Sequence, residues 1–120
     1  MQCIGIDIVE INRIRKAIDR WGLNFLKRVY TDSELALYLN NTSSLAARFS
    51  GKEAVIKTLN SKGIGLKDIE ILPDIQGKPR VKLHGKARHQ AEDMGLINLD
   101  ISLSHCHDYA IACAIGETKN

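Results

Sequence analysis

Alternating hydrophobic and polar residues predict five strands in this chain. They cover residues 3–9, 68–72, 80–83, 98–104 and 109–115. In the first strand Ile4, Ile6 and Ile8 share one face, and Asp7 lies on the other. Aspartate is rare in strands, and a partly buried carboxylate needs a cation or several hydrogen-bond donors. Asp7 therefore indicates either a cap for the following helix or a binding site.

Hydrophobic residues three and four positions apart predict helices between these strands. The helices cover residues 11–21, 23–30, 32–39, 44–59 and 86–94. Gly22 and Gly95 mark two of their ends, and Thr31 with Glu34 predicts a capping box at the start of a third. Elements in this irregular order predict an α+β fold, with a single domain over residues 1–120.

The predicted helix from Ser44 to Leu59 contains residues that plain packing does not explain. Its apolar stripe consists of Leu45, Phe49, Ile56 and Leu59. Lys52 falls inside this stripe, and Gly51 costs the helix about 1 kcal/mol relative to alanine. Lys52 either extends its ammonium group to the surface or contacts a ligand. Glu53 and Lys57 have the spacing of an exposed helical ion pair, which is the plainest interpretation of these two residues.

Positive charge is concentrated in one segment. Residues 10–30 carry six basic and two acidic side chains, a net charge of +4, whereas the rest of the chain has a net charge of −1. This segment indicates an acidic partner, which could be a protein, a phosphate compound or a nucleic acid.

The sequence contains no apolar run that could span a membrane and no visible signal peptide. Cys3, Cys106 and Cys113 follow no metal-binding spacing. They fit free thiols in a reducing compartment, so we expect a cytoplasmic protein.

Two carboxylates with few other oxygen ligands suit Mg²⁺, which keeps several waters and takes its remaining ligands from phosphate. Asp7 and Glu53 form the candidate pair. Arg48, Lys52 and Lys57 on the same helix as Glu53 fit a phosphorylated substrate. A pyrophosphate bridged by Mg²⁺ would use all of these groups.

Four segments carry motifs of a known family. They are GIDIVEINRI at 5–14, FSGKEAVIKTL at 49–59, GIGLKDIEI at 63–71 and ISLSHCHDYAIA at 101–112. In this order and with these intervals, they resemble the holo-acyl-carrier-protein synthase branch of the phosphopantetheinyl transferases over nearly the whole chain. The chain departs from the family at Ser50 and Gly51, where alanine-like residues are expected.

The resemblance implies a fold, a reaction and an assembly. The fold is a small, mostly antiparallel sheet packed on helices. The reaction moves the 4′-phosphopantetheine arm of coenzyme A to a serine of acyl carrier protein in fatty acid biosynthesis, and it releases adenosine 3′,5′-bisphosphate. The assembly is a homotrimer with active sites between subunits, where the alanine face of residues 109–115 would suit close packing.

The resemblance also implies roles for individual residues. Asp7 and Glu53 would bind Mg²⁺, and Glu53, Lys57 and His105 would be catalytic. The residues implied to contact coenzyme A are Arg48, Lys52, Lys57, Gly63, Gly65, Ser104 and His105. The basic residues Arg13, Arg15 and Arg20 would meet the acidic carrier protein. Three groups are candidates for the general base: Glu53, a water on the metal, and His105.

Other functions fit parts of the sequence. A basic module that binds nucleic acid fits residues 10–30, but aromatic residues that could stack on bases are few and no RNA-binding motif is present. Hydrolysis of pyrophosphate with Mg²⁺ would need a richer acidic cluster than Asp7 and Glu53. A metal site at residues 105–107 has no fourth ligand at a suitable spacing. We therefore expect neither nucleic acid nor a membrane as a partner.

Overall fold

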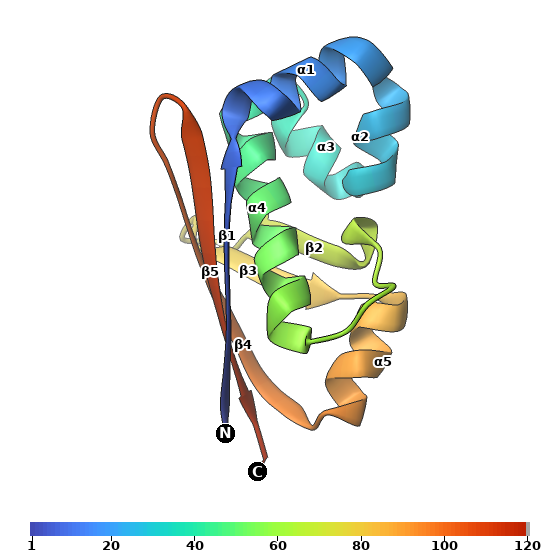
Figure 1. Cartoon of the computed structure of the whole chain (residues 1–120), viewed down its shortest axis with the longest axis vertical. Helices are drawn as coiled ribbons and strands as arrows, with labels where there is room; N and C mark the ends of the chain where they lie inside the picture. The colour runs from blue at the N-terminus through green and yellow to red at the C-terminus, as the bar shows by residue number, and fades with distance from the viewer. Residues whose placement is uncertain (120) are drawn as a thin grey trace.

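A three-stranded antiparallel sheet and one long helix position the other elements. The computed structural model describes residues 1–119. The sheet consists of β1 (Gln2–Glu10), β4 (Leu96–His105) and β5 (Tyr109–Thr118) in the order β1-β5-β4. Helix α4 (Thr42–Leu59) packs along β1 and β5 (Figure 1).

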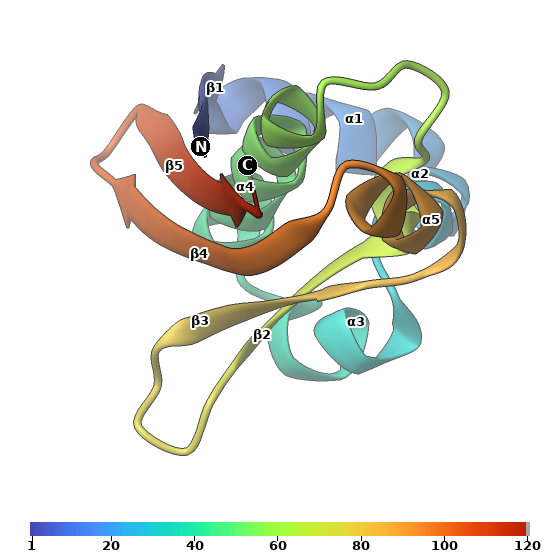
Figure 2. The same ribbon diagram turned by 90° about the horizontal axis from the view of Figure 1, so that it is seen from below.

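The remaining elements surround α4. Three short helices lie at one end of the molecule: α1 (Ile11–Trp21), α2 (Leu23–Val29) and α3 (Asp32–Tyr38). The second sheet pairs β2 (Ile69–Pro73) with β3 (Pro79–Leu83), and this hairpin projects from the body of the molecule (Figure 2). The short 3₁₀ helix η1 (Leu66–Asp68) precedes β2, and α5 (Gly85–Asp93) follows β3. The predicted α+β fold with antiparallel sheets is confirmed.

The ends of the elements differ from the predictions by one to three residues, for local reasons. Helix α4 begins at Thr42, two residues earlier than predicted, because the side chain of Asn41 accepts a hydrogen bond from the backbone of Ser44 at 3.0 Å. Strand β5 extends to Thr118 because it pairs with β1 up to Glu117 and with β4 at Thr118.

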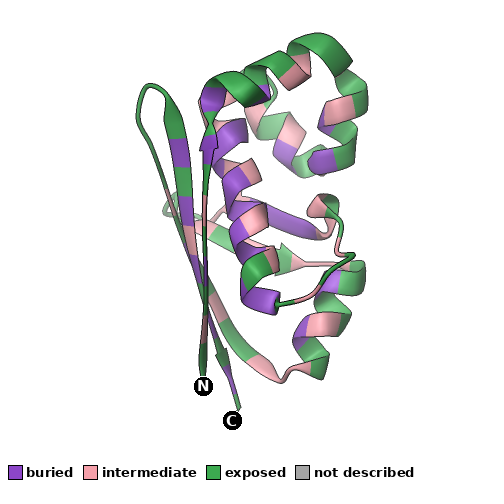
Figure 3. Ribbon diagram, viewed as in Figure 1, coloured by how far each residue is buried: buried purple, intermediate pink, exposed green. Residues whose placement is uncertain are grey.

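Helix α4 is buried on most of its surface, so the prediction of one apolar stripe was wrong (Figure 3). Small side chains on the other faces, such as Ala46, Ala47 and Ala54, are buried as well. They let both sheets approach the helix closely. Gly51 has the same purpose, because a Cβ atom there would lie 2.7 Å from Ile71 Cδ1 and 3.0 Å from a Leu103 methyl group.

The two faces of the first sheet have opposite surroundings. The small side chains of β5, Ala110, Ala112 and Ala114, are buried in the hydrophobic clusters that also contain residues of α4. The expectation that this face meets another subunit was therefore wrong. The opposite face carries exposed isoleucines, which we call the isoleucine face: Ile4, Ile6, Ile8, Ile111 and Ile115.

Candidate active site

The carboxylate of Asp7 reaches α4 because β1 approaches that helix without a side chain in between. A Cβ atom on Gly5 would overlap the carbonyl oxygen of Ala54 and lie 2.6 Å from Thr58 Oγ1. Glycine is thus the only residue type that fits at position 5. The close approach of β1 that it allows brings Asp7, two positions later, against the middle of α4.

Asp7 is held by two residues of α4. The Ser50 hydroxyl donates to the Asp7 backbone carbonyl at 2.8 Å and lies 3.1 Å from its Oδ2. Lys57 Nζ lies 3.2 Å from Oδ1 and donates to the carbonyl of Ile6 at 2.9 Å. The side chain of Asp7 is only 17% exposed. The cap interpretation of Asp7 was wrong, and Ser50 departs from the family pattern at a position where its hydroxyl steadies this carboxylate.

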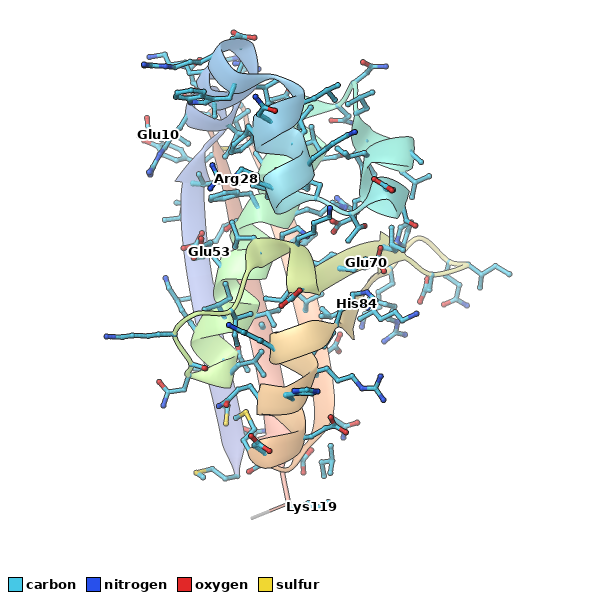
Figure 4. All side chains as sticks on the ribbon, turned by 90° about the vertical axis from the view of Figure 1, so that its right-hand side faces the viewer. Glu10, Arg28, Glu53, Glu70, His84 and Lys119 are labelled. Carbon is cyan, nitrogen blue, oxygen red and sulfur yellow. The ribbon has the colours of Figure 1, made fainter. Side chains whose placement is uncertain are left out.

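Glu53 lies one turn from Ser50, on the side of α4 that faces β1 (Figure 4). Partial burial raises the pKa of Glu53 above its usual value of 4.5, and the nearby charge of Asp7 raises it further. Lys57 and Arg13 oppose this shift in pKa without cancelling it. Within residues 1–119, no group donates a hydrogen bond to the Glu53 carboxylate. The exposed Glu53–Lys57 ion pair was also a wrong interpretation, because Lys57 pairs with Asp7 instead.

The donor set at this position fits a hard divalent cation. Two carboxylates repel each other, so a cation between them would relieve this repulsion. Over the described residues, no three His, Cys, Asp or Glu side chains gather in a way that could hold a metal ion. Two protein carboxylates are a donor set that suits Mg²⁺, which binds through one or two carboxylates, waters and substrate phosphates.

Lys52 does not reach the surface or a ligand, so both interpretations of this residue were wrong. Its side chain is fully buried, and its Nζ lies 2.7 Å from Glu34 Oε1. Burial lowers the pKa of Lys52, whereas the Glu34 charge opposes this shift. No sequence pattern indicates this pair, because the capping box already explains Glu34 and Lys52 follows it by 18 residues.

Arg48 contacts α3 rather than the carboxylates. Its guanidinium stacks over the Tyr38 ring at 3.8 Å, and Nη2 donates to the Tyr38 hydroxyl at 2.7 Å. Its Nε is buried without a partner among the described residues. The contact of Arg48 with coenzyme A stays a prediction.

His105 lies at a different place on the chain from Glu53. With Arg15 and Ser43 it lines an open cavity of about 890 Å³ at the β4–β5 turn. Ser43 precedes Glu53 by ten residues of α4, which corresponds to about 15 Å along the helix axis. Ser104 is exposed on the opposite face of β4. One copy of the chain thus brings together Asp7, Glu53 and Lys57 but leaves His105 and Ser104 apart from them.

The remaining predicted positions are exposed. Gly63 and Gly65 lie in the loop after α4, and neither has an atom within 4 Å of where a Cβ would be. His107 pairs with Asp108 at 2.9 Å on the solvent-exposed β4–β5 turn, in keeping with a role in shaping the turn. The basic residues Arg13, Arg15 and Arg20 are exposed along α1. The three cysteines are free thiols, as expected.

The sequence matches the family model of the 4′-phosphopantetheinyl transferase superfamily over residues 3–114. The chain belongs to this superfamily. It is therefore an enzyme of the transferase class, and the resemblance of its four motifs is confirmed. Within residues 1–119, none of the helices has both the length and the hydrophobicity needed to cross a lipid bilayer.

Curated members of the superfamily are similar to nearly the whole chain. A holo-[acyl-carrier-protein] synthase of Dehalococcoides mccartyi is 48% identical over 114 residues, which is 94% of this chain and 96% of the relative. The synthase of Herpetosiphon aurantiacus is 42% identical over 125 residues, which is 97% of this chain and 98% of the relative.

Solved structures of superfamily members share the fold. The Helicobacter pylori holo-[acyl-carrier-protein] synthase in complex with coenzyme A superposes with a TM-score of 0.86 at 33% identity, covering 95% of this chain and 99% of that chain. A coenzyme A complex from Chronobacterium ammoniagenes gives a TM-score of 0.88 at 27% identity, covering 100% and 99%.

Proposed function

We propose that this transferase moves the 4′-phosphopantetheine arm of coenzyme A to a serine of acyl carrier protein, with Mg²⁺, in cytoplasmic fatty acid biosynthesis. The observation that carries the proposal is the cluster of Asp7, Glu53 and Lys57, in which the charge of Asp7 helps to raise the pKa of Glu53 and Lys57 pairs with Asp7. This cluster matches the chemistry of a charged pyrophosphate bound through a cation. The relatives named as holo-[acyl-carrier-protein] synthases support the choice of substrates.

Asp7 and Glu53 are the residues that would hold Mg²⁺. When bound, the ion would neutralise charge on the pyrophosphate and act as a Lewis acid toward it. Ser50 and Lys57 keep the Asp7 carboxylate in a fixed orientation through the contacts described above. This fixed geometry matters because electrostatic stabilisation acts best when the groups need no rearrangement.

Lys57 is suited to the leaving phosphate. The serine oxygen forms a bond to the β-phosphorus, the bond from this phosphorus to the bridging oxygen breaks, and adenosine 3′,5′-bisphosphate leaves. The half-exposed ammonium group of Lys57 can stabilise the growing charge and supply a proton to the leaving oxygen. Glu53 is our preferred acceptor of the serine proton, because Lys57 pairs with Asp7 and leaves the Glu53 carboxylate without an ion-pair partner among the described residues.

Lys57→Ala is expected to lower kcat by about 100-fold with a much smaller rise in the KM for coenzyme A. The reason is that Lys57 meets a charge that develops only in the transition state. Steady-state kinetics over a range of coenzyme A concentrations checks this. The exposed Lys86 of α5 serves as the control, and Lys86→Ala should leave both constants unchanged. A rise in KM alone would make Lys57 a binding residue.

We propose that the complete site forms between copies of the chain in a homotrimer. The isoleucine face is exposed on a single copy, with Ile4 69% and Ile8 61% exposed, and a face of this kind usually meets another protein surface. The cavity lined by His105 does not include Asp7, Glu53 or Lys57, so a neighbouring copy is the natural source of the histidine that contacts coenzyme A.

We propose that the carrier protein docks on the basic face of α1. Arg13, Arg15 and Arg20 are exposed there, whereas Ile11 and Ile14 of the same helix are buried. An open apolar cavity of about 430 Å³ adjoins this face, and Trp21, Phe25 and Phe49 line it. Positive charge beside an apolar hollow suits an acidic helical protein. Arg13 also acts on the pKa of Glu53, which links this surface to the carboxylates.

Arg20→Glu is expected to raise the KM for the carrier protein about tenfold at low salt and to leave the KM for coenzyme A unchanged. Charges of this kind steer association and are screened over a Debye length of about 8 Å at physiological ionic strength, so the difference should shrink as salt is added. Lys86→Glu reverses an exposed charge on α5 and is the matched control. An unchanged carrier KM in Arg20→Glu would place the docking surface elsewhere.

The proposed function is tested by mass spectrometry of apo acyl carrier protein after incubation with the chain, coenzyme A and Mg²⁺. The carrier should gain the mass of one phosphopantetheine arm, and one adenosine 3′,5′-bisphosphate should appear for each arm transferred. Removing Mg²⁺ with a chelator should stop both. Folded protein that produces neither product would overturn the proposal.

A further inference from the structure

A fully buried ion pair lies beside the candidate site. Lys52 and Glu34 both have side chains with no exposed surface. Lys52 Nζ lies 2.7 Å from Glu34 Oε1, and it also donates to the backbone carbonyls of Leu66 and Ile69. The ammonium group therefore uses all three of its protons in contacts with α3, η1 and β2.

Both oxygens of the Glu34 carboxylate also accept hydrogen bonds from the backbone. Its Oε1 accepts from the backbone of Thr31 at 2.9 Å, as part of the capping box, and its Oε2 accepts from the backbone of Ile71 at 2.8 Å. The pair thus joins α4 to α3, η1 and β2. A buried pair is a poor source of stability, because apolar residues of similar volume often serve equally well. Its value here should lie in geometry.

The ion pair is connected to two parts of the site: the turn of α4 that carries Glu53, and the loop that contains Gly63 and Gly65. Lys52 is the residue before Glu53, so the pair fixes the turn of α4 that carries this carboxylate. Leu66, whose carbonyl Lys52 holds, ends the loop that contains Gly63 and Gly65. At both glycines the described structure leaves open space around the backbone, so the loop lacks packing at these points. The hydrogen bond from Lys52 to the Leu66 carbonyl therefore holds the C-terminal end of this loop.

We propose that Lys52, through its pair with Glu34, is a positioning residue. It keeps Glu53 and the loop of residues 60–66 in fixed positions relative to each other, so that both can meet the phosphates of coenzyme A. The proposal rests on the proposed function. It requires that removal of both charges lets Glu53 and this loop move relative to each other, even in a protein that still folds.

The decisive variant is Lys52→Met with Glu34→Gln, because Lys52→Met alone would leave a carboxylate buried without a counter-charge. We measure thermal unfolding, the affinity for Mn²⁺ in the presence of coenzyme A by electron paramagnetic resonance, and steady-state kinetics. The double variant should unfold cooperatively, yet bind Mn²⁺ about tenfold more weakly and show about a tenfold higher KM for coenzyme A. The KM for the carrier protein should not change.

Lys67→Met removes an exposed lysine of η1 and is the matched control, with all constants unchanged. A double variant with unaltered Mn²⁺ affinity and KM would overturn the proposal, because the pair would then serve the fold alone. The proposal would also be overturned if the losses of Mn²⁺ binding and of activity in the double variant matched the fraction of the sample that is unfolded.

Hydrogen exchange on the unaltered protein tests the proposal even if the double variant does not fold. Mn²⁺ with coenzyme A should slow exchange of the Ile71 amide, which donates to Glu34, by about tenfold more than that of the Met94 amide at the end of α5. Equal slowing at both amides would overturn the positioning role. Failure of the unaltered protein to bind coenzyme A at all would instead count against the proposed function.

Discussion

Glu53→Gln is expected to abolish transfer of the phosphopantetheine arm and, at the same time, to raise the melting temperature of the metal-free protein. Glutamine is a weak ligand for Mg²⁺ and no base, so the rate should fall by about 1000-fold or more. The gain in stability follows from the surroundings of this carboxylate. Burial and the charge of Asp7 raise its pKa, which means that the folded protein holds the ionised form less favourably than the unfolded chain does.

The sign of the pH dependence follows from this shift. At neutral pH the ionised Glu53 destabilises the metal-free fold, and the glutamine variant lacks this penalty. As the pH falls below the usual glutamate value of about 4.5, the carboxylate is protonated in both the folded and unfolded states, and the advantage of the variant should vanish.

Calorimetry of both proteins in a chelator, at neutral pH and near pH 4, measures this difference. Glu92→Gln on the exposed face of α5 is the matched control and should move neither activity nor melting temperature. A Glu53→Gln protein that melts below the unaltered protein at neutral pH would show that the carboxylate is stabilised in the fold, contrary to the repulsion inferred here. Near-normal turnover would remove Glu53 from the metal site.

Gly5→Ala is expected to cost about 3 kcal/mol or more of unfolding free energy, the upper end of the range for overpacked sites. The added methyl group would overlap the carbonyl oxygen of Ala54. This oxygen is a backbone atom of α4, so it cannot move away by a side-chain rotation. Either β1 or α4 must move, and with it the distance between Asp7 and Glu53. We expect activity to fall even in the fraction that remains folded.

Denaturant unfolding of Gly5→Ala, with activity measured on the folded fraction, tests this. Gly65→Ala provides the comparison, because Gly65 has an ordinary negative φ of −75° and open space around it. Its unfolding free energy should be equal to that of the unaltered protein or higher by a few tenths of a kcal/mol. A Gly5→Ala protein of normal stability would mean that β1 and α4 can separate without harm.

Sequence patterns predicted those parts of the fold that depend on neighbours in the chain. The capping box of Thr31 and Glu34 spans three residues, and both of its hydrogen bonds are present. Gly22 and Gly95 both adopt positive φ after the helices that they were expected to end. Alternation correctly separated the two faces of β1. It could not say which face is covered, and the face of small alanines on β5 was assigned to another subunit although α4 covers it.

The parts that could not be predicted depend on residues far apart in sequence. Lys52 was noticed as out of place, but nothing in the chain identified Glu34 as its partner, because that glutamate already had a local explanation. The pairing of Asp7 with Glu53 rested on their chemistry as two unusual carboxylates and on the family motifs, because 46 positions separate the two residues and their spacing in the sequence does not give a distance in space. Ser50 was seen only as a departure from the family, whereas its hydroxyl contacts Asp7.

The order of the strands has a consequence for how the site forms during synthesis. β1 is the first strand made, yet its hydrogen-bonding partner is β5, the last, with Gln2 opposite Glu117. Ribosomes deliver the chain from the N-terminal end, so Asp7 and Glu53 are both present long before the strand that holds Asp7 in place has been translated. Closing a loop of this length is also costly in chain entropy. Until β5 emerges, β1 lacks its strand partner and the residues of α4 that pack on β5 stay uncovered, so we expect a nascent chain stalled before β5 to bind chaperones.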